Sequence, residues 1–112
     1  MEIKTQNGIV KLPGIKSRVG LTSNIKDIDG NPVSYTVVGE IVFPAPSNPR
    51  KAFAIHLLKY NSGEEEIRIG YYMISQKEGR MKGKWMWGQY SPIMTKEEMK
   101  RIYLEAINRG WI

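Results

Sequence analysis

The chain has 112 residues, of which 41% are hydrophobic and 25% are charged, and this composition excludes general disorder and predicts one globular domain over residues 1–112. It contains no cysteine, which excludes disulfides, thiolate metal sites and cysteine nucleophiles. The formal net charge of +6 favours attraction to polyanions such as nucleic acid.

The N-terminal half is predicted to consist of strands joined by tight turns. Residues Ile3 to Leu12 predict a short strand, with Asn7-Gly8 as a turn inside it. A stronger turn signal, Asp29 to Pro32, lies between two segments of alternating apolar residues, Arg18 to Ile28 and Val33 to Phe43. These two segments therefore predict a β-hairpin.

A proline-rich break and three more strands follow. The segment Pro44 to Pro49 contains prolines that neither a central strand nor a helix interior can hold. Lys51 to Tyr60 alternates apolar residues and predicts a strand. Glu66 to Gln76 and Arg80 to Tyr90 also alternate, and Lys77-Glu78-Gly79 reverses the chain between them, so they predict a second hairpin.

The C-terminal segment predicts a helix. Thr95 and Glu98 have the spacing of a capping box, and Gly110 is suited to the position just past the helix end, with Trp111 folding back onto the last turn. An apolar stripe that can cover a sheet consists of Met99, Ile102, Tyr103, Ala106 and Ile107. Strands followed by one helix predict an α+β fold: an antiparallel sheet of five to six strands built from hairpins, with one face covered by the single C-terminal helix.

No pattern of residues predicts a catalytic centre, a metal site or a cofactor. His56 is the only histidine and lies in an apolar strand, where a hydrogen-bonded structural role is expected. Glu40 interrupts another apolar strand, and alternation places it on the wetter side of the sheet. The run Glu64 to Glu66 predicts solvated charges, since no calcium-loop spacing surrounds it. We therefore do not expect an enzyme.

The segment Arg80 to Tyr90 interleaves cations and aromatic rings, as single-strand nucleic-acid sites do. Alternation along a strand places the cations and the tryptophans on opposite faces. Trp85 and Trp87 are therefore expected to pack in the core under the helix, and the cations are expected to form an open face. The neighbouring strand adds an arginine and a tyrosine. The predicted nucleic-acid site is therefore Arg68, Tyr72, Arg80, Lys82, Lys84 and Tyr90. An exposed sheet edge that lysines protect against aggregation is the alternative.

Residues 68–107 resemble the positive-cofactor-four transcriptional coactivator family. The resemblance rests on the hairpin Gly79-Arg80-Met81-Lys82-Gly83-Lys84 and on Pro92-Ile93-Met94-Thr95, which opens the helix. It implies four antiparallel strands followed by a helix, and binding of single-stranded DNA, with Arg68, Lys82 and Lys84 on the DNA-facing sheet. The run Trp85 to Tyr90 has no clear counterpart in that family.

The sequence thus favours a small non-enzymatic module that binds single-stranded nucleic acid. The alternative is a protein-interaction or assembly domain, including a homo-oligomer, that uses an open sheet edge. A small-ligand carrier or enzyme with a pocket between sheet and helix, near Glu40 or His56, has the least support. No apolar run approaches the roughly 20 residues that span a bilayer, and residues 1–10 lack the layout of a secretory signal, so we expect a cytoplasmic protein without a membrane partner.

Overall fold

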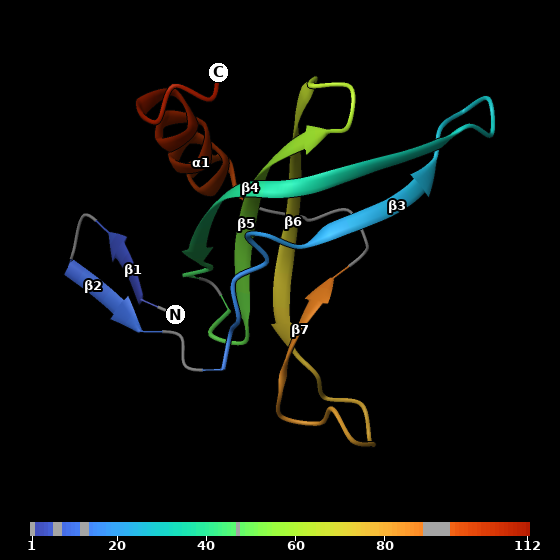
Figure 1. The fold of residues 1–112 in the computed structure, drawn as a ribbon. Coiled ribbons are helices and arrows are strands. Elements are labelled where there is room, and N and C mark those ends of the chain that lie inside the picture. Colours follow the sequence, from blue (N-terminus) through green and yellow to red (C-terminus); the bar gives the residue numbers. More distant parts are fainter. Residues whose placement is uncertain (1, 6–7, 12–13, 47, 89–94) are drawn as a thin grey trace.

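The computed structural model of the chain describes residues 2–5, 8–11, 14–46, 48–88 and 95–112, and the side chains of the last three ranges. Strands precede a single helix along the chain, as expected for the α+β class (Figure 1). The elements are β1 (Glu2–Thr5), β2 (Gly8–Lys11), β3 (Thr22–Lys26), β4 (Pro32–Pro44), β5 (Lys51–Tyr60), β6 (Glu65–Ile74), β7 (Trp85–Gly88) and α1 (Lys96–Asn108).

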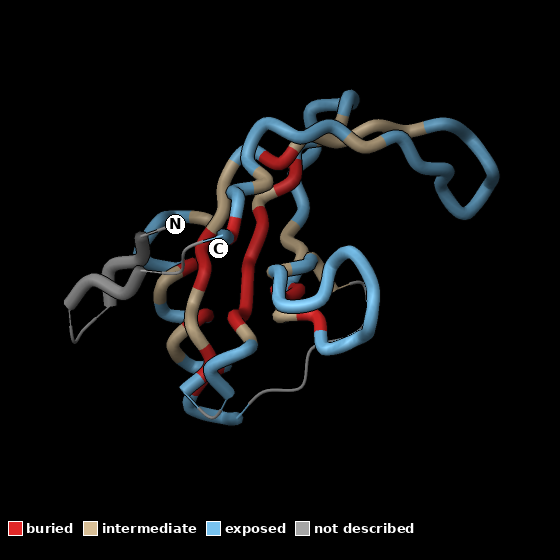
Figure 2. Tube along the Cα trace, turned by 90° about the horizontal axis from the view of Figure 1, so that it is seen from below, coloured by how far each residue is buried: buried red, intermediate tan, exposed pale blue. Residues whose placement is uncertain are grey.

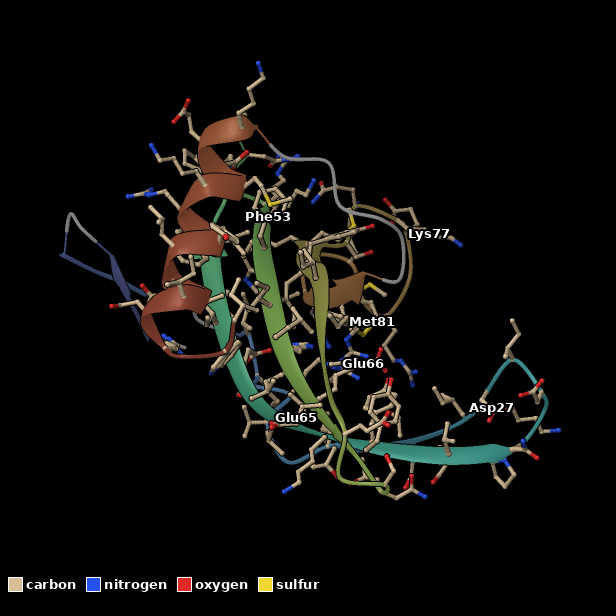
Figure 3. All side chains as sticks on the ribbon, turned by 90° about the horizontal axis from the view of Figure 1, so that it is seen from above. Asp27, Phe53, Glu65, Glu66, Lys77 and Met81 are labelled. Carbon is tan, nitrogen blue, oxygen red and sulfur yellow. The ribbon has the colours of Figure 1, made fainter. Side chains whose placement is uncertain are left out.

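Five strands form one antiparallel meander in the order β3-β4-β5-β6-β7. The predicted hairpin around Asp29 is confirmed, since β3 pairs with β4 from Thr22 opposite Thr36 to Lys26 opposite Pro32. This hairpin extends well beyond the rest of the sheet as an arm, with Asp27 near its far end (Figures 1 and 3). Within the described part of the chain, β1 and β2 pair only with each other, in a separate sheet of two strands.

The helix packs against one face of the sheet, which we call the helix face. Its capping box is confirmed, because Glu98 N donates to the Thr95 hydroxyl and Thr95 N donates to the Glu98 carboxylate. Figure 3 shows Phe53 on the side of β5 that faces the helix. The buried core there consists of Ile41, Ala45, Phe53, Ile55, Tyr71, Ile102 and Ala106.

The helix stripe is only partly buried, which corrects the expectation that all of it covers the sheet. Ile102 and Ala106 are each 1% exposed, whereas Met99, Tyr103 and Ile107 are exposed. The side of the helix that carries Ile102 and Ala106 contacts the sheet. The neighbouring positions Met99, Tyr103 and Ile107 point toward solvent. The helix ends as expected, since Gly110 has a positive φ of 72° and Trp111 N donates to the carbonyl of Ala106.

The opposite face, which we call the second face, has a core of its own: Ile15, Val42, Ala52, Ala54 and Tyr72, with Trp85 and Trp87 packed against it. Figure 2 shows that the buried positions concentrate on the central strands. Trp85 and Trp87 therefore do not pack under the helix. Their register decides this, because Trp87 pairs with Tyr72 and Trp85 pairs with Ile74, on the face away from the helix.

Two glycines admit tryptophan rings on opposite faces of the sheet. A Cβ on Gly39 would lie 2.7 Å from Trp111, which covers β4 on the helix face. A Cβ on Gly70 would overlap the ring of Trp87, which covers β6 on the second face. Each large ring thus lies on a strand position that has no side chain.

A β-bulge in β4 changes which residues share a face. Val37 pairs with Leu58 and Gly39 with Leu57, so Val38 is an extra residue between them. The extra residue shifts the alternation of side chains along β4 by one position. Glu40 therefore lies on the second face together with Val37, whereas strict alternation would place it together with Val38. The placement of Glu40 on a wetter side is therefore wrong, since its side chain is 3% exposed.

Candidate functional site

Three polar side chains form a row across the second face, which we call the polar ladder. Glu40 on β4 pairs with His56 on β5, and His56 pairs with Arg68 on β6. Side chains at paired positions point to the same face and lie close enough to interact. His56 is fully buried, so the centre of the polar ladder lies inside the protein.

The hydrogen bonds of the ladder fix the proton of His56. Arg68 Nη2 lies 2.9 Å from His56 Nδ1, and Nδ1 accepts because a guanidinium has only donors. The imidazole proton is therefore on Nε2, which donates to Glu40 Oε2 at 2.6 Å. His56 is neutral in this arrangement and lies between a carboxylate and a guanidinium. The expectation that His56 is hydrogen-bonded within an apolar strand is confirmed.

Two tyrosines extend the ladder. The Tyr72 hydroxyl donates to Glu40 Oε2 at 2.6 Å, and Arg68 Nη1 donates to the Tyr35 hydroxyl at 2.8 Å. Burial alone would raise the pKa of Glu40, but the hydrogen bonds from His56 and Tyr72 hold it below its ordinary value of 4.5. Burial and the bond to Glu40 raise the pKa of Tyr72, so its hydroxyl keeps its proton and remains a donor.

Trp87 packs against the ladder. Its ring stacks on His56, with ring centroids 4.7 Å apart, and meets the ring of Tyr72 edge-on at 5.2 Å. The guanidinium carbons of Arg18 and Arg68 lie 5.3 and 5.0 Å from the centroid of Trp87. These cation–π contacts and the stacked ring hold Trp87 in one orientation.

A cavity of about 750 Å³ lies beside this cluster, between residues 14–18 and the β6–β7 hairpin. Three cations line it, Lys16, Arg18 and Lys84, and none of the described residues in its lining is acidic. Its aromatic lining consists of Tyr72, Trp85 and Trp87. The chemistry of this lining suits a ligand that is both anionic and planar.

Backbone hydrogen bonds hold Lys84 at the cavity wall. Ser75 N donates to the carbonyl of Lys84 at 2.9 Å, and Gly83 N donates to the carbonyl of Ser75 at 2.9 Å. Residues 77–84 therefore form a loop, and the strand predicted from Arg80 begins only at Trp85. Arg80, Lys82 and Lys84 do not alternate on a sheet face, because none of them is in a strand.

The predicted nucleic-acid residues fall into separate groups. Arg80, Lys82 and Lys84 are exposed on the loop, and Lys82 forms an ion pair with Glu78. Arg68 belongs to the polar ladder and Tyr72 is 4% exposed, so the Tyr72 ring has no free face for a base. Tyr90 lies outside the described residues.

Lys16, Arg18 and Trp85 are site residues that the sequence did not indicate. Residues 14–18 have no periodic pattern, and their position over the second face depends on the burial of Ile15 against Tyr72 and its neighbours. Arg18 Nε is buried and has no hydrogen-bond partner within the described part of the chain.

Fold and site together define an antiparallel meander with one helix and a cationic, aromatic cavity on the face away from that helix. Comparison of the chain with family models, with curated proteins and with solved structures finds no match. Across the described residues, no helix is long and apolar enough to cross a membrane. The same residues contain no group of three or more side chains that could hold a metal ion.

Proposed function

We propose that the protein is a non-enzymatic module that binds single-stranded nucleic acid at the cavity on the second face. The lining of the cavity supports this most directly, because Lys16, Arg18 and Lys84 lie near Trp85 there, and its described residues include no carboxylate. Cations neutralise phosphates, and aromatic rings stack on unpaired bases.

The loop 77–84 extends the positive surface from the cavity. Arg80 is exposed and Lys84 lines the cavity wall, whereas Glu78 offsets the charge of Lys82. In this proposal a strand enters at the cavity and continues past Arg80. The ligand class agrees with the resemblance of residues 68–107 to the positive-cofactor-four family, but Arg68 belongs to the polar ladder and Tyr72 donates to Glu40.

Anisotropy titrations with a labelled single-stranded oligonucleotide at several salt concentrations test the proposal. We expect the logarithm of the binding constant to fall linearly with the logarithm of salt concentration. Lys16→Gln and Lys84→Gln should each reduce the slope by about 0.7, the value for one phosphate contact on a single strand. Both side chains are exposed, so neither substitution should alter the fold.

Lys100→Gln is the matched control, since Lys100 is an exposed lysine on α1, which packs on the other sheet face. It should leave the slope nearly unchanged. Absence of binding at low salt, or equal losses in the Lys84→Gln and Lys100→Gln variants, would reject the proposal.

A second candidate function is assembly through the open edge of β3. β3 is the first strand of the five-stranded order and pairs only with β4 along the described chain. Its residues are mostly exposed, and Ile28 at the end of the arm is fully exposed. An unpaired edge is a template for pairing with another chain. Sedimentation velocity over a wide concentration range tests this, and a strict monomer would contradict it.

A further inference from the structure

The size of the cavity suits a small group. A volume of about 750 Å³ lies within the range of about 300–1,000 Å³ that is usual for small-ligand sites. It is enough for one unpaired nucleotide. A base inside a duplex is stacked on both sides and cannot enter such a cavity without leaving the stack.

The charge of the cavity exceeds what a phosphate within a strand requires. A phosphodiester carries one negative charge, whereas a phosphate monoester carries about −1.5 to −2 at neutral pH and has three acceptor oxygens. Lys16 and Arg18 come from the segment before β3 and Lys84 from the loop before β7, and all three line the same cavity. Three cations with no acidic residue among the described lining residues match a monoester better than a diester.

Arg18 provides a donor for such a group. Its guanidinium lies over Trp87, 5.3 Å from the ring centroid, which restricts its orientation. The Arg18 side chain also lines the cavity. A guanidinium binds phosphate oxygens through two parallel donors, and a held guanidinium loses less entropy when it does so.

Trp85 provides a ring for the base. Trp87 is already stacked on His56 and contacts Tyr72. Trp85 is half-buried and lines the cavity, and among the described side chains it stacks on no other ring. Base–aromatic stacking tolerates any base, because every base has a π-face.

We infer that the cavity binds one nucleotide that carries a terminal phosphate monoester, with the phosphate on Lys16, Arg18 and Lys84 and the base against Trp85. This inference rests on the proposed function and specifies which part of a strand the cavity holds. The end of a strand and a free mononucleotide share this chemistry, so the experiment separates them.

The test uses the full chain and one oligonucleotide in three forms: with a 5′-phosphate, with a 3′-phosphate and with hydroxyl groups at both ends. The fluorophore is attached internally. We expect one of the phosphorylated forms to bind about tenfold tighter than the hydroxyl form, which corresponds to one additional charge-assisted contact. Lys84→Gln should remove this preference, and Lys100→Gln should retain it.

Competition by adenosine and uridine monophosphates and by inorganic phosphate identifies the source of the ligand. Displacement of the oligonucleotide by either monophosphate at a concentration similar to that of the phosphorylated strand indicates a free mononucleotide, and displacement by the strand alone indicates a strand end. Both results support the inference. Displacement by inorganic phosphate as strong as that by the monophosphates contradicts a role for the base.

The inference and the proposed function can fail separately. If the three forms bind equally and with steep salt dependence, the cavity does not select a terminal phosphate, but binding of single strands stands. If direct calorimetric titration shows that monophosphates bind and no oligonucleotide does, the nucleotide cavity stands and the proposed function is wrong.

Discussion

The two faces of the sheet bury their apolar residues under different elements. On the helix face, an apolar core is covered by α1, and its buried members are hydrophobic apart from the Tyr71 hydroxyl. On the second face, the core shares its space with the polar ladder, and residues 14–18 and Trp87 cover it only in part. The first arrangement provides stability, and the second leaves a cavity with charged walls.

The difference between the two faces shows which face of a small sheet can hold charged side chains around a cavity. On the helix face the Lys51 ammonium lies over the rings of Phe53 and Tyr71, whereas a partly covered face can hold several charges at its rim if its buried polar groups are satisfied. The polar ladder meets that condition at Glu40 Oε2 and at both ring nitrogens of His56, whereas Glu40 Oε1 has no hydrogen-bond partner among the described residues. The two faces should therefore respond differently to substitution.

The largest effect is expected on the helix face. Phe53 is 2% exposed at the centre of that core, and Phe53→Ala should lower the free energy of unfolding by about 3–5 kcal/mol because it leaves a cavity. Urea unfolding followed by circular dichroism measures this. Under conditions where the variant is still folded, its oligonucleotide affinity should equal that of the parent. A loss of affinity without a loss of stability would contradict the division between the faces.

The next effect is expected from Glu40→Gln, which should cost about 2–3 kcal/mol at pH 7 because it removes the charged acceptor of two buried hydrogen bonds. The pKa of Glu40 lies below the ordinary 4.5, so its ionised form stabilises the protein above pH 4.5, and this contribution is lost as the pH falls through the lower pKa of the folded state. The difference between variant and parent should therefore shrink in acid.

Unfolding curves of both proteins at pH 7 and at pH 3 check this dependence on pH. Glu64→Gln is the control, since Glu64 is exposed and its substitution should change neither curve appreciably. A difference between parent and Glu40→Gln that stays constant down to pH 3 would show that the ionised carboxylate is not what stabilises the ladder.

A smaller effect is expected from Tyr72→Phe. This change removes one of the two donors to Glu40 Oε2 but keeps the ring against Trp87, so we expect a loss of about 1–2 kcal/mol. The pKa of Glu40 should rise, and acid unfolding should begin at a higher pH. Tyr103→Phe on the exposed side of α1 is the control. Equal stability of the two variants would mean that the Tyr72 hydroxyl contributes nothing to the ladder.

Much of the fold could be predicted because its signals are local. The capping box at Thr95, the turn before Pro32 and the alternation of Lys51 to Tyr60 each lie within a few residues of the element they define. The turn at residues 77–79 is predicted, but residues 80–84 were wrongly expected to belong to the following strand, since their cations alternate. Gly83 has a positive φ of 77°, which a strand does not contain.

The candidate site could not be predicted because it depends on tertiary register. The bulge at Val38 shifts the alternation of β4, and only this shift places Glu40 opposite His56. Arg18 reaches Trp87 from a segment without periodicity. Charge and aromatic content were the basis for expecting a nucleic-acid ligand, but which cations share a cavity depends on contacts between residues far apart in the sequence.

The smallest effect is expected at the surface pair of Lys82 and Glu78, and it distinguishes the loop from the cavity. Both side chains are more than half exposed, so Lys82→Gln should change the free energy of unfolding by less than about 0.5 kcal/mol. In oligonucleotide titrations the same variant should lose less affinity than Lys84→Gln, because Glu78 already offsets the charge of Lys82. Glu78→Gln should free that charge and strengthen binding at low salt. If Lys82→Gln weakens binding more than Lys84→Gln, then the strand lies along the loop and not in the cavity.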